Sequence, residues 1–332
     1  RSQEDLSLFD TLLAFDSQSS GESISSPASH SPLEPVGAVE TRSAKALSNG
    51  RREKSQANVL AIAPLNLAQI EMFVDEHGES GKRFCEDLVA HFLEPLTRRP
   101  LDVKKYLRYW VDKGGFGGHM EMLEYSVRHE LKESSENTEL DLLTPEQSRQ
   151  GAITLAATAM LCRRRDFALP GTSSDALQPR ESLPDSWTDN EVASLLDRAI
   201  FDSPLFGRIR FHQRETEEYL TARWLDWLVT NNLSTKSLKQ VLFQELPSQQ
   251  LVLRPALASV TAWFSCLDSD AAKQVRGWVR DAEPELFFRA GDPSKLPLVY
   301  RQSLLDAIIE SYSDREFTRI EVDRPALTRF AH

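Results

Sequence analysis

Apolar side chains recur at helical spacing along most of the chain after residue 65. In the stretch LAQIEMFVDEHG, Ile70, Phe73 and Val74 fall on one helical face, and Asn66 precedes them as an N-cap. Pro100 stands in the first turn of a later helical pattern, where proline is favoured. The spacing predicts helices over residues 67–78, 84–93, 101–111, 120–131 and 145–165, with the glycine-rich residues 114–118 as a loop.

A short apolar run, VLAIAPL at residues 59–65, precedes the first of these helices. It starts with a β-branched residue and is interrupted by Pro64, which is typical of a buried strand that leaves a sheet. We therefore expect a strand that leads into the helix capped by Asn66.

Residues 194–230 follow a different order. Residues 194–203 have helical spacing, two short apolar runs flank Gly207, and a long helical stretch covers residues 213–228. Helix, hairpin and helix in this order are expected of a winged-helix module. On the last helix, the stripe of Tyr219, Ala222, Trp224 and Leu225 is predicted to lie in the core.

Four further amphipathic segments follow, at residues 237–245, 249–267, 271–279 and 298–312. Consecutive helices joined by short loops favour an α-helical repeat packing. The predicted fold class is mainly α: a helical domain and a winged-helix module with a small β hairpin, followed by a repeat-like sensor region. The domains are predicted at residues 57–135, 136–232 and 233–332, after a linker or insertion at residues 1–56.

The first segment has a composition that does not support a core. Residues 1–55 contain thirteen serines, few aromatic residues and a polar stretch interrupted by prolines. Such a stretch buries too little apolar surface to offset its chain entropy. We expect disorder over residues 17–55, so limited proteolysis should cut there first and leave a resistant fragment that begins near Asn58.

The overall composition narrows the classes of partner. The 332 residues carry a formal net charge of −11, which gives no general support for binding nucleic-acid phosphate. Neither a long apolar run nor a signal peptide is present, so we expect a cytoplasmic protein without a membrane partner. The first residue is Arg1, which suggests a piece of a longer protein. Cys85, Cys162 and Cys266 lie far apart and are expected to be reduced.

Several motifs that resemble catalytic sites fail on inspection. In HGESGKRF the dipeptide Gly81-Lys82 suggests a phosphate loop, but Arg83 stands where Ser or Thr should hold magnesium. No nucleophile or metal motif is found, and the arginines at 163–165 are expected at a solvated helix end. The paired acids Glu217 and Glu218 are predicted to lie on the solvated surface of a helix. We therefore expect no catalytic residue and no metal ligand, and this chain is predicted not to be an enzyme.

The order of segments nevertheless resembles a known family. VLAIAPLNLAQIEMFVDEHG and the helical residues after it look like the end of the nucleotide-binding sheet and the helical domain of NACHT-type STAND NTPases. IRFHQRETEEYLTARWL is similar to the phenylalanine-histidine and Glu-Tyr-Leu-x-Ala segment of their winged-helix domain. The resemblance covers roughly residues 57–230, and the C-terminal part resembles helical regions of bacterial defence members more weakly.

The resemblance implies a nucleotide switch that closes over ADP at rest. Pro100 would pack against adenine and His212 would contact the β-phosphate, whereas an upstream part would bind ATP and hold magnesium. A proline ring makes a flat apolar wall, and a neutral or charged imidazole can donate to phosphate oxygen. Two alternatives stay open, because Pro100 could simply start a helix and His212 could be a core histidine. No Walker A or Walker B motif lies in these residues, so autonomous hydrolysis is not expected.

The predicted function is the regulatory and sensor portion of such a switch, in antiviral or stress defence signalling. The expected partners are a protein trigger and, on activation, further copies of the protein. The alternative is a nucleotide-independent α-solenoid scaffold for protein interactions. We expect residues 235–332 to carry the partner surface. Their large aromatic residues either anchor that partner or pack between adjacent helices: Trp263, Phe264, Trp278, Phe287 and Phe288.

Overall fold

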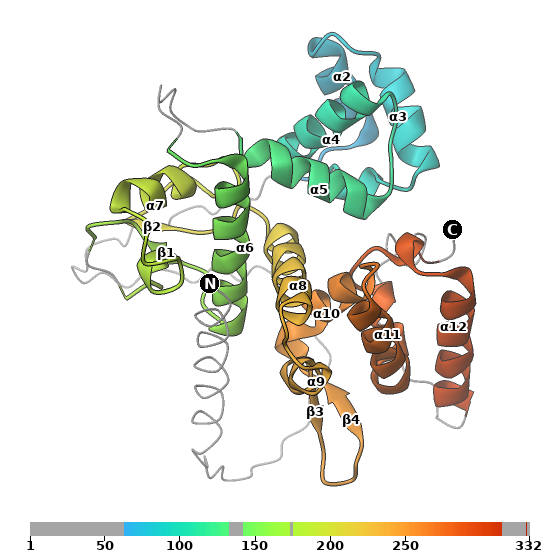
Figure 1. Ribbon diagram of the computed structural model, residues 1–332. Coiled ribbons are helices and arrows are strands. Elements are labelled where there is room, and N and C mark those ends of the chain that lie inside the picture. Colours follow the sequence, from blue (N-terminus) through green and yellow to red (C-terminus); the bar gives the residue numbers. More distant parts are fainter. Residues whose placement is uncertain (1–62, 133–141, 173–174, 314–329, 331–332) are drawn as a thin grey trace, which may run out of the picture.

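A computed structural model describes residues 63–132, 142–172, 175–313 and 330 of the chain. This part is mainly helical and contains two small antiparallel sheets of two strands each (Figure 1). The predictions for residues 1–56, disorder over 17–55 included, lie outside the described residues, as does most of the strand predicted at 59–65. Residues 63–65 of that predicted strand are not in a strand.

The first four helices of the described residues confirm the helical pattern. They are α2 (Leu67–Glu76), α3 (Gly81–Ala90), α4 (Pro100–Lys113) and α5 (His119–Glu130). Asn66 caps α2 in a capping box: its Oδ1 accepts from the Gln69 amide at 2.9 Å, and Gln69 Oε1 accepts from the Asn66 amide at 3.0 Å. Pro100 is the first residue of α4, where its missing N–H costs nothing. The helices enclose a small core that includes Ile70, Phe84, Val103 and Met122.

The described residues in the middle of the chain form three α-helices and one two-stranded sheet. These elements are α6 (Pro145–Leu161), β1 (Phe167–Ala168), α7 (Asp189–Leu196), β2 (Arg208–Ile209) and α8 (Arg214–Thr230). Helix α6 ends four residues before the predicted position, and α7 lies earlier than the helix predicted at 194–203. Gly151 lets α6 approach its neighbours, because a Cβ there would lie 2.7 Å from Leu195 Cδ2 and 2.8 Å from Trp187 Cη2.

The predicted hairpin around Gly207 is only partly present. Leu205 and Arg208 form an isolated antiparallel bridge across the turn, but β2 pairs with the distant strand β1 through Phe167 and Ile209. A strand that is far away in sequence therefore completes this sheet. The core stripe on α8 is confirmed, because Tyr219, Ala222, Trp224 and Leu225 are all buried.

Up to residue 313, the described C-terminal part contains four α-helices and a hairpin. The elements are α9 (Thr235–Leu242), β3 (Phe243–Glu245), β4 (Leu251–Leu253), α10 (Ala258–Ser265), α11 (Asp270–Ala282) and α12 (Leu298–Ser313). The predictions of helix at 237–245 and 249–267 are wrong at the end of the first segment and the start of the second. There β3 pairs with β4, and Phe243 lies opposite Leu253. Five short 3-10 helices lie among the described residues: Glu94–Leu96, Pro179–Glu181, Pro255–Leu257, Pro284–Phe288 and Pro293–Lys295.

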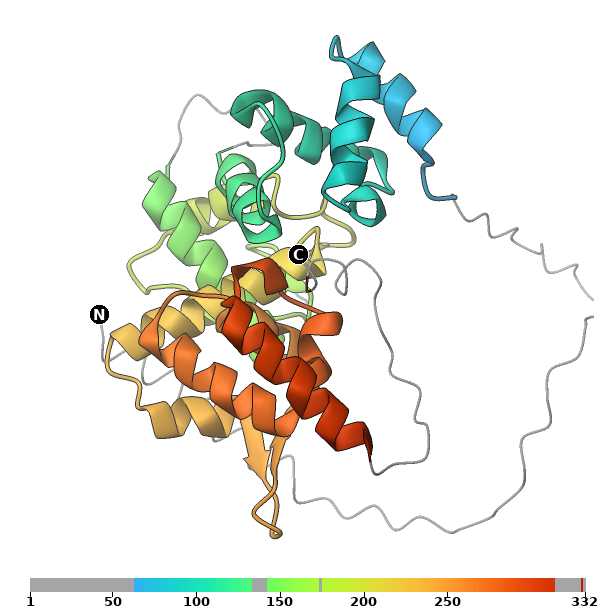
Figure 2. The same ribbon diagram turned by 90° about the vertical axis from the view of Figure 1, so that its right-hand side faces the viewer.

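The C-terminal helices share their core with α8. A larger hydrophobic cluster runs from Leu123 in α5 through α6 and α8 into α10, α11 and α12, which pack on one another (Figure 2). Four of the five C-terminal aromatic residues are buried in it, and Trp278 is half-buried against Phe243. These rings therefore pack between elements and do not form an exposed partner surface. No described helix is both long and apolar enough to cross a bilayer.

Candidate functional site

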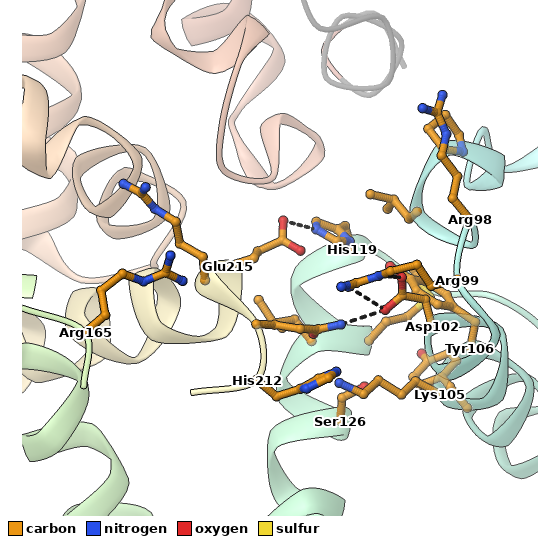
Figure 3. Close-up of a pocket in the computed structure, with 17 residues that line it drawn as sticks. Arg98, Arg99, Asp102, Lys105, Tyr106, His119, Ser126, Arg165, His212 and Glu215 are labelled. Atoms are coloured by element: carbon orange, nitrogen blue, oxygen red, sulfur yellow. Dashed lines mark hydrogen bonds and ion pairs between the residues drawn. The ribbon is translucent and has the colours of Figure 1, made fainter. Parts of the chain in front are cut away.

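A cavity of about 580 Å³ lies where α4 and α5 face the segment that enters α8 (Figure 3). The loop between α6 and β1 adds one side chain, that of Arg165. The lining residues come from segments far apart in sequence: Pro95, Leu96, Arg98, Arg99, Asp102, Lys105, Tyr106, Tyr109, His119, Met122, Leu123, Ser126, Arg165, His212, Gln213, Arg214 and Glu215.

The structure brings the two predicted site segments to this one cavity. His212 lines it directly, whereas Pro100 is exposed at the start of α4 and is not a lining residue. The residues on either side of the proline, Arg99 and Asp102, face the cavity instead. Residues near Pro100 at the start of α4, and not Pro100 itself, therefore contribute side chains to the cavity.

Asp102 fixes the geometry between the two segments. Its side chain is about 10% exposed and accepts two hydrogen bonds from Arg99, from Nε at 2.7 Å and from Nη2 at 3.0 Å. A third comes from Gln213 Nε2 at 2.7 Å, on the opposite wall. A buried carboxylate with this many donors is held in place, so Asp102 connects α4 to the residue next to His212.

The orientation of His212 is set by Asp202. His212 Nδ1 lies 2.6 Å from Asp202 Oδ1, and Arg210 Nε donates to the other carboxylate oxygen at 2.9 Å. Burial alone would raise the pKa of Asp202, but the hydrogen bonds from Arg210 and His212 outweigh it and lower the pKa. Among the described residues, the other ring nitrogen of His212, Nε2, is buried without a hydrogen-bond partner.

This arrangement defines what His212 can do. A neutral imidazole that donates from Nδ1 to Asp202 has only an acceptor at Nε2. Protonation makes Nε2 a donor as well. As an imidazolium, His212 can therefore donate from Nε2 to an anion in the cavity.

Cationic side chains dominate the cavity wall, although the chain as a whole is acidic. Lys105 and Arg214 already have carboxylate partners, at 2.5 Å to Glu130 and 2.8 Å to Glu218. Arg98 has no ion pair within the described part of the chain. The lining contains five arginines and lysines, Arg98, Arg99, Lys105, Arg165 and Arg214, against the two carboxylates Asp102 and Glu215. The excess of positive charge favours an anionic ligand.

His119 connects the cavity to the C-terminal helices. It is buried, its Nε2 lies 2.8 Å from Glu215 Oε1, and its ring centroid is 5.5 Å from that of Trp263 in α10. The next amide, that of Met120, donates at 2.8 Å to Asp292, whose side chain is fully buried. The start of α5 is therefore held at two points by the C-terminal part. No sequence motif marks His119 for this role.

The structure contradicts the prediction that Glu217 and Glu218 lie on a solvated helix surface. Both are buried, with 3% and 8% of the residue exposed, because α8 lies between α6 and α10. The prediction of a solvated helix surface is therefore wrong. Burial raises the pKa of Glu217 to about 7, and it also raises the pKa of Glu218.

Other chemistry is limited in the described part of the chain. The three cysteines there are free thiols, and burial raises the pKa of Cys85 to about 11. Within the same residues, no group of three or more His, Cys, Asp and Glu side chains is placed to hold a metal ion.

Comparison with known proteins does not supply a relative: no protein-family model matches the chain, and neither does any curated protein. The cavity and its side chains therefore provide the basis for a functional assignment.

Proposed function

We propose that the cavity binds the phosphate groups of ADP or ATP, and that the chain is the regulatory and sensor portion of a STAND-type nucleotide switch. The observation that carries the proposal is His212 Nε2, which is buried without a partner in a wall rich in arginine and lysine. A buried polar atom without a partner is costly, and an anion would remove that cost.

The position of the cavity suits a switch. A ligand held by α4 on one side and by His212 and Arg214 on the other would stabilise the closed arrangement of these walls. The Asp102–Gln213 hydrogen bond supports the same closed arrangement without ligand. Adenine contact by Pro100 stays a prediction, because that residue does not line the cavity.

The sensor role gains support from the contacts of His119. Through Trp263 and Glu215 it lies between the C-terminal core and the cavity wall, so a change in the C-terminal helices has a direct route to the ligand. In this proposal a protein trigger acts on the C-terminal part, activation leads to homo-oligomers, and the setting is antiviral or stress defence. Magnesium and hydrolysis belong to an upstream nucleotide-binding part.

Isothermal titration with ADP tests the proposal. We expect the chain to bind ADP and His212→Ala to weaken binding by about tenfold to a hundredfold, the equivalent of about 1.5–3 kcal/mol for a hydrogen bond to a charged group. His77→Ala is the matched control, because His77 lies at the end of α2 and does not line the cavity. In the parent protein, the same His212 substitution should raise basal activity. Equal ADP affinities for the chain and for His212→Ala contradict the proposal.

The α-solenoid scaffold is the alternative, and the same titration separates the two. A scaffold of that kind works without nucleotide, so it predicts that neither the chain nor its cavity variants bind ADP. A scaffold role leaves unexplained why five arginines and lysines line the cavity against two carboxylates.

A further inference from the structure

Two arginines at the cavity are each backed by a buried glutamate of α8. Arg214 lies against Glu218, and Arg165 lies against Glu217. Both arginines line the cavity, whereas the two carboxylates lie behind it in the core. A ligand anion in the cavity therefore competes with a buried carboxylate for each guanidinium.

The two pairs differ in strength. Arg214 Nε donates to Glu218 Oε1 at 2.8 Å, and the two residues lie one turn apart on the same helix. Arg165 comes from the loop after α6 and reaches toward α8 (Figure 3), but its Nε stays 4.0 Å from Glu217 Oε2. Half of the Arg165 side chain is exposed, against 4% for that of Glu217. The second pair is thus a loosely held cation over a deeply buried carboxylate.

We infer that Arg165 moves from Glu217 to the phosphate groups when the nucleotide binds, and that Glu217 then takes up a proton from solvent. This inference rests on the proposed function, since it needs an anion in the cavity. If it holds, Arg165 is a further phosphate contact of that site, and ADP binding there depends on pH.

The proton uptake follows from the surroundings of Glu217. The charged groups that act on it are Arg165 from the loop and Arg214 and Glu218 on its own helix. Arg214 is committed to Glu218, and Glu218 repels a second negative charge. When Arg165 moves away, the buried carboxylate loses its main cation and its charged form becomes less favourable. The pKa of Glu217 already lies at about 7, so a further rise changes its protonation at neutral pH.

The direction of the pH dependence of ADP binding follows from the linkage between ligand binding and proton binding. A group that gains a proton on binding makes the ligand bind more tightly at low pH and more weakly at high pH. If binding raises the pKa of Glu217 by one unit, ADP affinity falls by up to about tenfold as the pH rises through that interval. ADP itself also titrates near this range, so the informative quantity is the difference in pH dependence between the chain and a variant without the carboxyl group.

The test is the ADP affinity of the full chain between about pH 6 and pH 8, with proton uptake measured by titration in buffers of different ionisation enthalpy. In Glu217→Gln, Arg165 has no charged competitor, so we expect tighter binding than in the unmodified chain at pH 8 and a smaller pH dependence. Glu86→Gln is the control and should retain the pH dependence of the unmodified chain, because Glu86 is exposed on α3 and does not line the cavity.

A measurement without ligand adds an independent check. We expect the carboxyl carbon resonance of Glu217 to titrate near pH 7 in the free chain and at higher pH in Arg165→Gln. Identical titration in the two proteins overturns the inference, as does identical pH dependence of ADP affinity in the chain and in Glu217→Gln. Failure of the chain to bind ADP at all is a different result, which overturns the proposed function together with the inference.

Discussion

Gln213 Nε2 donates to Asp102 Oδ1 at 2.7 Å, although 111 positions separate the two residues. Gln213 follows the predicted phosphate contact His212, and Asp102 follows the predicted adenine contact Pro100 by two positions. The hydrogen bond therefore joins the two segments that sequence reasoning singled out. It places the first turn of α4 and the entry to α8 on facing walls of one cavity.

Replacing Gln213 should loosen this closure without unfolding the chain. Asp102 Oδ1 keeps a second donor in Arg99 Nη2 at 3.0 Å, so Gln213→Ala does not leave the carboxylate unsatisfied. We expect a loss of about 0.5–1.5 kcal/mol in the free energy of unfolding. Urea denaturation measures it, with Gln240→Ala in α9 as a control away from the cavity. A loss above about 3 kcal/mol would mean that Asp102 depends on Gln213 far more than its other contacts suggest.

Glu217 should reduce stability at neutral and alkaline pH. Its pKa is raised from 4.5 to about 7 by burial, so the folded state prefers the protonated form. Below pH 4.5 both folded and unfolded chains are protonated there; as the pH rises to 7 the unfolded chain ionises first and wild-type stability falls. Glu217→Gln should therefore be more stable than the wild type at pH 8, by up to about 3 kcal/mol, and the gain should vanish near pH 4. Denaturation at the two pH values checks this, and a gain that persists at low pH refutes it.

Asp292 should hold the start of α5. Its buried side chain accepts from the Met120 amide at 2.8 Å and from Ser294 Oγ at 2.6 Å. Asp292→Ala leaves the amide without its acceptor, and we expect a loss of about 1–3 kcal/mol together with faster hydrogen exchange at Met120. Ser294→Ala keeps the contact with Met120 and serves as the control. Unchanged exchange at Met120 in Asp292→Ala would show that the contact does not hold the helix.

Truncation before Ser237 should destabilise the remaining chain. If residues 235–332 only carried a partner surface, such a deletion in the parent would abolish the trigger response and spare nucleotide binding. The deletion removes Trp263, however, whose ring packs edge-on against Tyr219 of α8 at 5.6 Å. Loss of a buried tryptophan alone costs about 3–5 kcal/mol. We therefore expect low soluble yield and a lower Tm, and a truncated chain with an unchanged Tm would contradict the shared core.

Local signals predicted the starts of α2 and α4, because caps act within one turn. Asn66 before α2 and Pro100 at the start of α4 both occupy the expected positions. The strands were harder to predict. The pairing of Phe167 with Ile209 joins residues some forty positions apart and leaves no local signature. The hairpin of β3 and β4 has a local signature, since ELPSQQ is a turn-rich stretch between two apolar runs. The helical spacing of the flanking residues nevertheless predicts helices there.

The candidate site was predictable only in part, for the same reason. The resemblance pointed to His212, and this residue does line the cavity. The burial of Glu217 and Glu218 could not be anticipated, because it depends on α6 and α10 covering α8 from two sides. Charged residues are normally exposed. The pairing of Arg165 with Glu217 depends on the fold and is not evident from the sequence.

Helix α5 belongs to both hydrophobic clusters, with Met122 in the smaller one and Leu123 and Val127 in the larger. A helix packed into two bodies at once cannot act as a free hinge. The connection between α4 and α5 is different: Gly114 has φ of 76°, and a Cβ added to it would meet nothing within 4 Å. A swing of α2, α3 and α4 about this glycine-rich connector would nevertheless break their contacts with α5, including the Tyr109–Glu121 hydrogen bond and the Lys105–Glu130 ion pair, so α5 holds the two clusters together around the cavity.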